Sequence, residues 1–375
     1  MNLPNHQNLP IHHLAKAFNN TATSYKFYWF YVLIQMIKKE HEQTNILELL
    51  VRMVAAVWYP VHYYKLSYGV QDKLGHIAQS ALELKVLGLS MNTPPEKVVK
   101  SILGYIINHP NSDLAKQIRS LGEYVPYRFV RPWCYDLIEK GLKDKKVNNR
   151  IQEIFTGDYT EQTLQLPYYF TGKMVVFNEA WFHYFRQHLK IMEDFCLWNL
   201  LKYVQKRNPN VPNIVSKLFP PAKKDRNLST QRKFWNIIYT YTDEPLRCLF
   251  SNYQINVKQY DLDHFIPWSF VTHNQIWNLV PVVPIVNYQK SDKLPDIPTY
   301  IKGFGHLQYK AFNIGLEFKP KSKILEDYIG IVGNSLDEIK TLSEPDFILK
   351  LENQIQPLAQ IAQNMGFQNK WIYQK

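Results

Sequence analysis

Four polar residues in the C-terminal half are of the types that build a metal site beside a general base. Asp263 and His264 are adjacent, Asn278 follows fourteen residues after His264, and Asn287 follows nine residues later. Carboxylate and amide oxygens suit Mg²⁺ or Mn²⁺, and a histidine with an ordinary pKa of about 6.5 accepts protons near neutral pH. We therefore expect Asp263 and Asn287 to hold one divalent cation, with His264 as general base for phosphodiester hydrolysis.

The residues around this set resemble the motif of the HNH (His-Asn-His) endonucleases, which have the ββα-metal fold. The motif has an acid and a histidine, then Pro-x-Ser, then Asn-Leu, then a final histidine or asparagine with a nearby lysine. In this chain it reads Asp263-His264, Pro267-Trp268-Ser269, Asn278-Leu279 and Asn287 with Lys290. This version is most similar to the HNH domain of CRISPR effector nucleases and to stand-alone bacterial HNH proteins. The resemblance implies that Asn278 is a catalytic-site residue that braces the loop and helps to orient His264, without binding the metal.

A structural zinc ion is not expected. Many HNH domains carry two Cys-x-x-Cys pairs, but here the corresponding positions read Cys248-x-x-Ser251 and Val283-x-x-Val286. A tetrahedral cysteine site needs four thiolates, and one remains. Val283 and Val286 are expected to pack in the core instead.

Positive charge is concentrated in two segments of a chain whose net charge is +12. Residues 202–233 contain nine basic residues against one acidic residue, and residues 116–150 contain nine against four. Clustered positive charge attracts a phosphate backbone, so DNA is the expected partner. The residues expected to bind it are Lys223, Lys224, Arg226, Arg232, Lys233 and Lys290. For Lys290, a phosphate contact and a solvated lysine on a helix remain equal alternatives.

Short strands and one helix must position the motif. Residues 247–250 and 260–262 are expected to pair as strands, and a further short strand is expected through Asn278 and Leu279. Pro284 suits the first position of a helix that carries Asn287 and Lys290. Most of the remaining chain has helical spacing, with helices expected at 94–107, from Asn45 to before Pro60, and at 343–366. The expected fold is mainly α with an embedded ββα-metal (HNH) nuclease unit, and α+β overall.

The length of 375 residues exceeds what one core usually holds. The Pro220-Pro221 pair and the basic, polar run that follows it suggest a boundary near 225–231. We expect a mainly helical region with basic segments at 1–230, an HNH nuclease domain at 231–305, and a mainly helical region at 306–375.

The composition favours a cytoplasmic protein. Three widely separated cysteines do not form a disulfide framework. The N-terminus lacks the pattern of a secretory signal, and the most apolar run, residues 27–37, is too short to cross a bilayer. A buried helix is expected for that run, and no membrane partner is expected.

Taken together, these features predict a metal-dependent HNH endonuclease that cleaves DNA, with the helical region binding substrate or a partner. Because free nuclease activity would harm the host cell, we expect an activating protein or nucleic-acid partner and a setting in bacterial defence. Two alternatives stay open: an RNA-directed or partner-activated nuclease subunit, and a catalytically silent nucleic-acid binding module.

Overall fold

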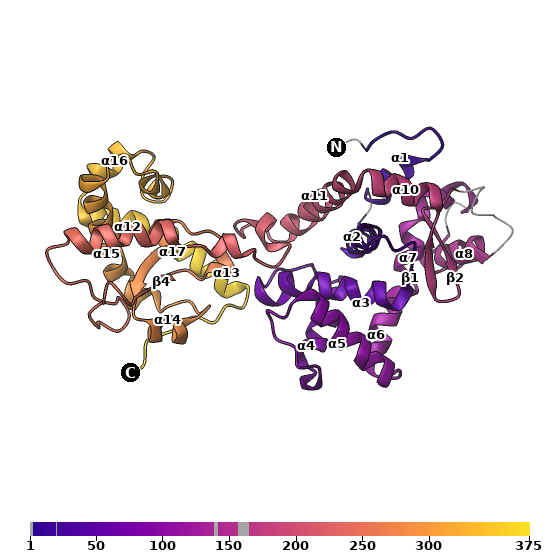
Figure 1. The fold of residues 1–375 in the computed structure, drawn as a ribbon, viewed down its shortest axis with the longest axis horizontal. Helices are drawn as coiled ribbons and strands as arrows, with labels where there is room; N and C mark the ends of the chain where they lie inside the picture. The colour runs from indigo at the N-terminus through magenta and orange to yellow at the C-terminus, as the bar shows by residue number, and fades with distance from the viewer. Residues whose placement is uncertain (1–2, 20, 139–141, 157–164) are drawn as a thin grey trace. The chain divides into compact units, whose positions relative to one another are not determined.

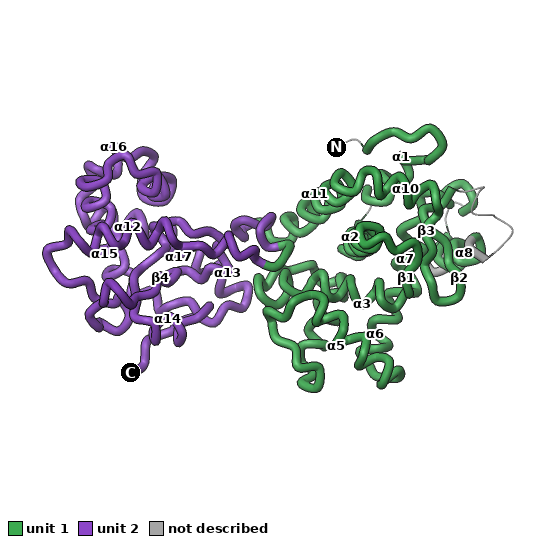
Figure 2. Tube along the Cα trace, viewed as in Figure 1, with its two compact units in different colours: residues 1–209, 218–220 green, residues 210–217, 221–375 purple. Residues whose placement is uncertain are grey.

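The computed structural model describes residues 3–19, 21–138, 142–156 and 165–375. It is mostly helical, with 60% helix and 7% strand (Figure 1), which confirms the expected mainly α composition. The chain forms two compact units, residues 1–209 with 218–220 and residues 210–217 with 221–375 (Figure 2).

This division differs from the expected domains at 1–230, 231–305 and 306–375. The second unit begins earlier, because Asn213 donates from Nδ2 to the carbonyl of Val271 at 3.0 Å. Its C-terminal part is continuous with the rest, because helix α15 (Ile297–Phe318) runs unbroken through residues 305 and 306 and packs against α12 (Ser229–Tyr241) and α17 (Glu344–Asn364). One core therefore joins residues 231–305 to 306–375.

The first unit is a group of helices with one small sheet. The described helices are α1 (Ile11–Ala17), α2 (Tyr25–Lys38), α3 (Ile46–Ala56), α4 (Leu74–Glu83), α5 (Pro95–Asn108), α6 (Asp113–Gly122), α7 (Val125–Phe129), α8 (Asp144–Thr156), α10 (Glu179–Gln187) and α11 (Leu189–Arg207). Strands β1 (Gln43–Asn45), β3 (Met174–Phe177) and β2 (Tyr168–Thr171) pair antiparallel in that spatial order.

Two expected helices are present close to their expected limits. Helix α3 begins after Asn45, whose side chain accepts from the backbone N–H of Leu47 at 2.9 Å, and a π-helical turn containing Pro60 follows it. Helix α5 begins at Pro95, and no side chain caps its N-terminus. The apolar run 27–37 lies in buried helix α2, as expected.

Residues 46–63 are apolar and long enough to span a bilayer by composition alone, but 56% of them are buried inside the fold. Helix α3, which makes up most of this stretch, packs against α2, α4, α5 and α6. A helix in the core of a protein can be as long and as apolar as one that crosses a membrane.

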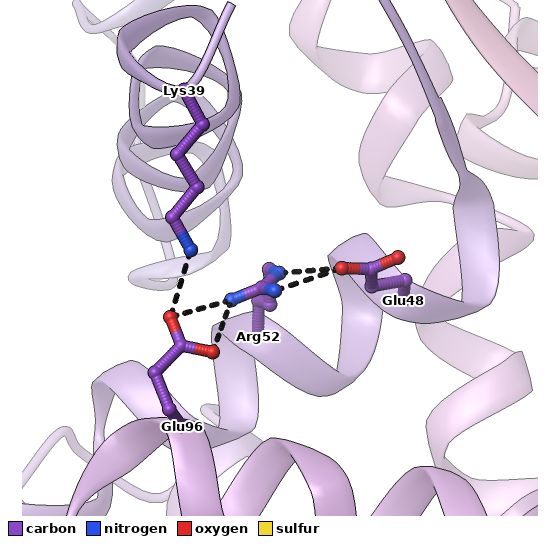
Figure 3. Close-up of polar contacts among 4 residues, drawn as sticks. All are labelled: Lys39, Glu48, Arg52 and Glu96. Atoms are coloured by element: carbon purple, nitrogen blue, oxygen red, sulfur yellow. Dashed lines mark hydrogen bonds and ion pairs between the residues drawn. The ribbon is translucent and has the colours of Figure 1, made fainter. Parts of the chain in front are cut away.

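An ion-pair network joins three of these helices (Figure 3). Arg52 on α3 donates to Glu48 at 2.8 Å and to Glu96 on α5 at 3.1 Å, and Lys39, just after α2, donates to Glu96 at 2.9 Å. Arg52 is the most buried of the four, with 16% of its side chain exposed. The network links the end of α2 and the start of α5 to α3.

The second unit contains helices α12, α13 (Trp268–Val271), α14 (Pro284–Lys290), α15, α16 (Leu336–Lys340) and α17, and strands β4 (Asp261–His264) and β5 (Leu279–Val282). Strand β4 pairs antiparallel with β5, with Asp263 opposite Val280 and His264 opposite Leu279. The expected strand at 247–250 is wrong. Arg247 forms only an isolated bridge to Gln254, because the intervening residues close a tight turn.

Helix α14 completes the ββα arrangement. Val283 is extended and Pro284 opens the helix, and Ser291, with φ of 50°, ends it. Helix α15 also contacts this unit, since Gln308 donates to the carbonyl of Leu279 at 2.8 Å and the Phe304 ring stacks 4.0 Å from that of Phe265, just after β4. The expected ββα unit is therefore confirmed, with β4 and β5 as its strands.

Candidate active site

Two carboxylates of β4 face helix α14. Asp261 and Asp263 are two residues apart in a strand, so their side chains share one face. Asn287 donates from Nδ2 to Asp261 Oδ2 at 3.1 Å, and Lys290 Nζ lies 2.9 Å from Asp263 Oδ2. Of the two expected metal ligands, Asn287 therefore contacts Asp261, and Asp263 contacts Lys290.

Lys290 differs from both expectations for it. Its side chain is fully buried rather than solvated or open to a phosphate. Besides its ion pair with Asp263, it donates to the carbonyl of His264 at 2.7 Å. Burial raises the pKa of Asp263, and the Lys290 ammonium opposes that shift. Lys290 therefore supports the backbone of the Asp-His pair from the last turn of α14.

His264 ends β4 and is 9% exposed. Its Nε2 lies 3.2 Å from Asn274 Oδ1 in the loop before β5. Burial lowers the pKa of His264 to about 3, and the hydrogen bond to Asn274 opposes the shift. The imidazole is therefore neutral at physiological pH, but burial makes it a weaker base than the ordinary histidine expected from the sequence.

Asn278 holds the loop that follows His264. It is completely buried, its Oδ1 accepts from the backbone N–H of Ile266 at 2.8 Å, and its Nδ2 donates to the Ile266 carbonyl at 2.9 Å. Its own carbonyl accepts from the N–H of Phe265 at 2.8 Å. Asn278 therefore fixes the backbone of Phe265 and Ile266, the two residues after His264.

The basic residues expected to bind DNA fall into two groups. Lys223, Lys224, Arg226 and Lys233 are exposed. Arg232 is half-buried, since it donates to the Tyr260 carbonyl at 2.7 Å and its guanidinium lies 4.7 Å from the Tyr260 ring centre. Arg232 is therefore engaged in holding the start of β4.

Two residues of the site were missed by reasoning from sequence. Asp261 carried a usable signal, because the Asp-x-Asp-His spacing places two carboxylates on one face of a strand. Asn274 lies in a loop, where no periodicity indicates which way a side chain points. Only the folded structure shows that it reaches His264.

The oxygen donors at β4 and α14 are of the types that suit a hard divalent cation, and one of them, Asp263 Oδ2, is paired with Lys290. Asp261 and Asp263 supply carboxylates, and Asn287 supplies an amide oxygen while its nitrogen is bonded to Asp261. The described residues contain no group of three or more His, Cys, Asp or Glu side chains placed to hold a metal ion. A cation here would therefore rely on the amide of Asn287, and on water or substrate for its remaining ligands.

The positions that carry cysteine pairs in other HNH domains contribute to packing. Cys248 is a buried free thiol, and Val286 is fully buried on α14. Val283 is half-buried at the start of that helix.

Comparison with known protein families gives a match to one segment of the second unit. Residues 241–296 match the family model described as HNH endonuclease. No curated protein and no solved structure gave a significant match. The matched segment includes β4, β5 and α14 with all four residues of the opening motif.

Proposed function

Residues 241–296 are an HNH endonuclease domain, a phosphodiester hydrolase within a largely helical protein, and on that premise we propose that the chain cleaves DNA with one divalent cation, Mg²⁺ or Mn²⁺. The observation that carries the proposal is the meeting of β4 and α14, where Asn287 bonds Asp261, and Lys290 pairs with Asp263 and bonds the backbone carbonyl of His264. We further propose a cytoplasmic location and a role in bacterial defence.

Each residue has a distinct part in the proposed reaction. His264 accepts a proton from the attacking water, which becomes the nucleophile at phosphorus. Asp263, Asn287 and Asp261 would hold the cation, which supplies charge neutralisation at the phosphate and the departing oxygen when bound. Lys290 fixes the backbone carbonyl of His264, and Asn278 fixes the backbone of the residues that follow it. The exposed cations Lys223, Lys224, Arg226 and Lys233 attract the phosphate backbone.

Cleavage of supercoiled plasmid by the purified full chain tests this function. We expect nicking or linearisation with Mg²⁺ or Mn²⁺, no cleavage with EDTA, and a loss of at least about 100-fold in His264→Ala and Asn287→Ala. Asn353→Ala is the matched control, since Asn353 is exposed on α17 of the same unit, and it should cleave normally.

A comparison of substrates determines which type of nucleic acid the chain cleaves. Duplex DNA, single-stranded DNA and RNA of one sequence should be assayed side by side, and preference for RNA would overturn the DNA proposal. Cleavage that persists in EDTA or in Asn287→Ala would show that the cation is not held as proposed. Salt-dependent binding of DNA without cleavage, alone or with co-purifying components, would favour the silent binding module.

A further inference from the structure

Asn274 connects the general base to the basic turn that precedes α12. It lies in the loop between α13 and the turn at Ile276–Asn278. Its Nδ2 donates to the carbonyls of Asp225 at 2.8 Å and Asn227 at 3.4 Å, and its Oδ1 lies 3.2 Å from His264 Nε2. All of these residues belong to the second unit.

The chemistry of these groups fixes the orientation of the amide. Backbone carbonyls only accept hydrogen bonds, so the two that face Asn274 require its NH₂ group rather than its oxygen. The amide oxygen must then face His264. Because a carbonyl oxygen cannot donate, the hydrogen bond forms only when His264 Nε2 carries a proton.

A neutral imidazole with its proton on Nε2 has its lone pair on Nδ1. The one hydrogen bond of this ring within the described part of the chain is the bond to Asn274, so Nδ1 has no protein partner there. Nδ1 is therefore the ring atom left to accept a proton from water.

We propose that Asn274 is a positioning residue that holds neutral His264 in the Nε2–H tautomer, makes Nδ1 the proton-accepting atom, and ties this arrangement to the basic turn at Lys223–Arg226. The assignment rests on the proposed function for its catalytic meaning. In the reaction a water O–H bond breaks and its proton forms a bond to Nδ1. The resulting hydroxide forms a bond to phosphorus, the bond from phosphorus to the departing oxygen breaks, and that oxygen takes a proton from solvent water. The imidazolium then keeps its Nε2–H bond to Asn274, whose oxygen stabilises the new positive charge.

The anchor of Asn274 is the same turn that carries exposed cations. Asp225 Oδ2 accepts from the N–H of Ala222 at 3.0 Å, which closes the turn, and Lys223 and Lys224 project into solvent. Since the Asp225 carbonyl holds Asn274, the conformation of the turn sets the position of the amide at His264. Phosphate binding to the turn and the alignment of the base thus share one structural element.

Nitrogen-15 NMR of the imidazole rings in the full chain at pH 8 tests the tautomer directly, with His264→Ala identifying the signals. We expect a protonated Nε2 and an unprotonated Nδ1 in the wild type, and a mixture of tautomers in Asn274→Ala. Gln275→Ala is the control for disturbance of the loop, because Gln275 bonds Trp277 rather than His264. An unprotonated Nε2 in the wild type, or an unchanged spectrum in Asn274→Ala, would overturn the proposal.

Steady-state kinetics of cleavage test the catalytic consequence. We expect Asn274→Ala to lower kcat by about 10-fold or more with little change in KM, Gln275→Ala to leave both near wild type, and the Lys223→Gln/Lys224→Gln pair to raise KM. An equal fall in kcat for Asn274→Ala and Gln275→Ala would show a general loop effect and overturn the positioning role. Because the NMR result needs no turnover, an inactive wild type would defeat the proposed function without deciding the tautomer.

Discussion

Among single residues, Lys290 shows how strongly the site depends on a buried ion pair. Its side chain is 0% exposed and that of Asp263 is 6% exposed. Removing one member of a buried pair leaves the other charge without compensation, which costs far more than loss of a surface pair. Lys290 is therefore expected to stabilise the fold of this unit as well as to fix the backbone of His264.

We predict that Lys290→Met lowers the free energy of unfolding of the nuclease unit by about 3–5 kcal/mol. The methionine fills similar space but leaves Asp263 unpaired in the core. Chemical denaturation followed by tryptophan fluorescence measures the change. Lys302→Met, at an exposed position of α15, should shift stability by less than about 0.5 kcal/mol, and equal effects of both changes would refute the argument.

Lys217 predicts a pH dependence of stability. It is completely buried, it donates to the Pro212 carbonyl and to Thr272 Oγ1, and burial lowers its pKa to about 7. Between pH 7 and its unfolded pKa of about 10.4 the unfolded chain holds a proton that the folded chain has released. The free energy of unfolding therefore rises with pH in that window, by up to about 1.4 kcal/mol per pH unit.

Denaturation of wild type and Lys217→Met from pH 7 to 9 checks this sign. The wild type should gain stability across the range relative to the variant, because only the wild type has this proton to release. Parallel curves for the two proteins would show that Lys217 does not set the pH dependence.

Among the elements, helix α15 packs closely against α12 because Gly315 has no side chain at their contact. A Cβ at Gly315 would lie 2.6 Å from the Phe234 ring of α12, whereas a Cβ at Gly104 on α5 would meet nothing within 4 Å. We predict that Gly315→Ala destabilises the second unit by about 1–3 kcal/mol. Gly104→Ala should stabilise the first unit by up to about 1 kcal/mol through helix propensity. Thermal unfolding measures both, and stabilisation by Gly315→Ala would contradict the packing argument.

Elements set by local sequence could be predicted, whereas features set by contacts between distant residues could not. Helix α17 was predictable, because Ser343 caps its N-terminus, Gly366 follows its end with φ of 87°, and apolar spacing lies between them. Strand β4 and helix α14 were predictable from the motif and from Pro284. The 247–250 segment was not, because short apolar runs do not distinguish a strand from a tight turn. The partner of His264 was not predictable either, since Asn274 reaches it through a loop fixed by tertiary contacts.

Across the whole molecule, the charge that is free to meet a nucleic acid is smaller than the sequence suggests. Of the nine basic residues in 202–233, Arg207, Lys217 and Arg232 donate to backbone carbonyls within the fold. Six remain exposed at Lys202, Lys206, Lys223, Lys224, Arg226 and Lys233. The first two lie on α11 of the first unit and the other four belong to the second unit, so each unit carries part of the basic segment.

This distribution predicts the salt dependence of DNA binding. Each lysine that neutralises a phosphate contributes about 0.9 to the slope of log affinity against log salt concentration. Lys223→Gln/Lys224→Gln should therefore reduce the slope by about two, measured by fluorescence anisotropy with a labelled duplex in EDTA to prevent cleavage. Lys319→Gln/Lys321→Gln removes the same charge from exposed positions after α15 and should leave the slope nearly unchanged. Equal reductions by the two pairs would mean that net charge, rather than the turn beside Asn274, attracts the backbone.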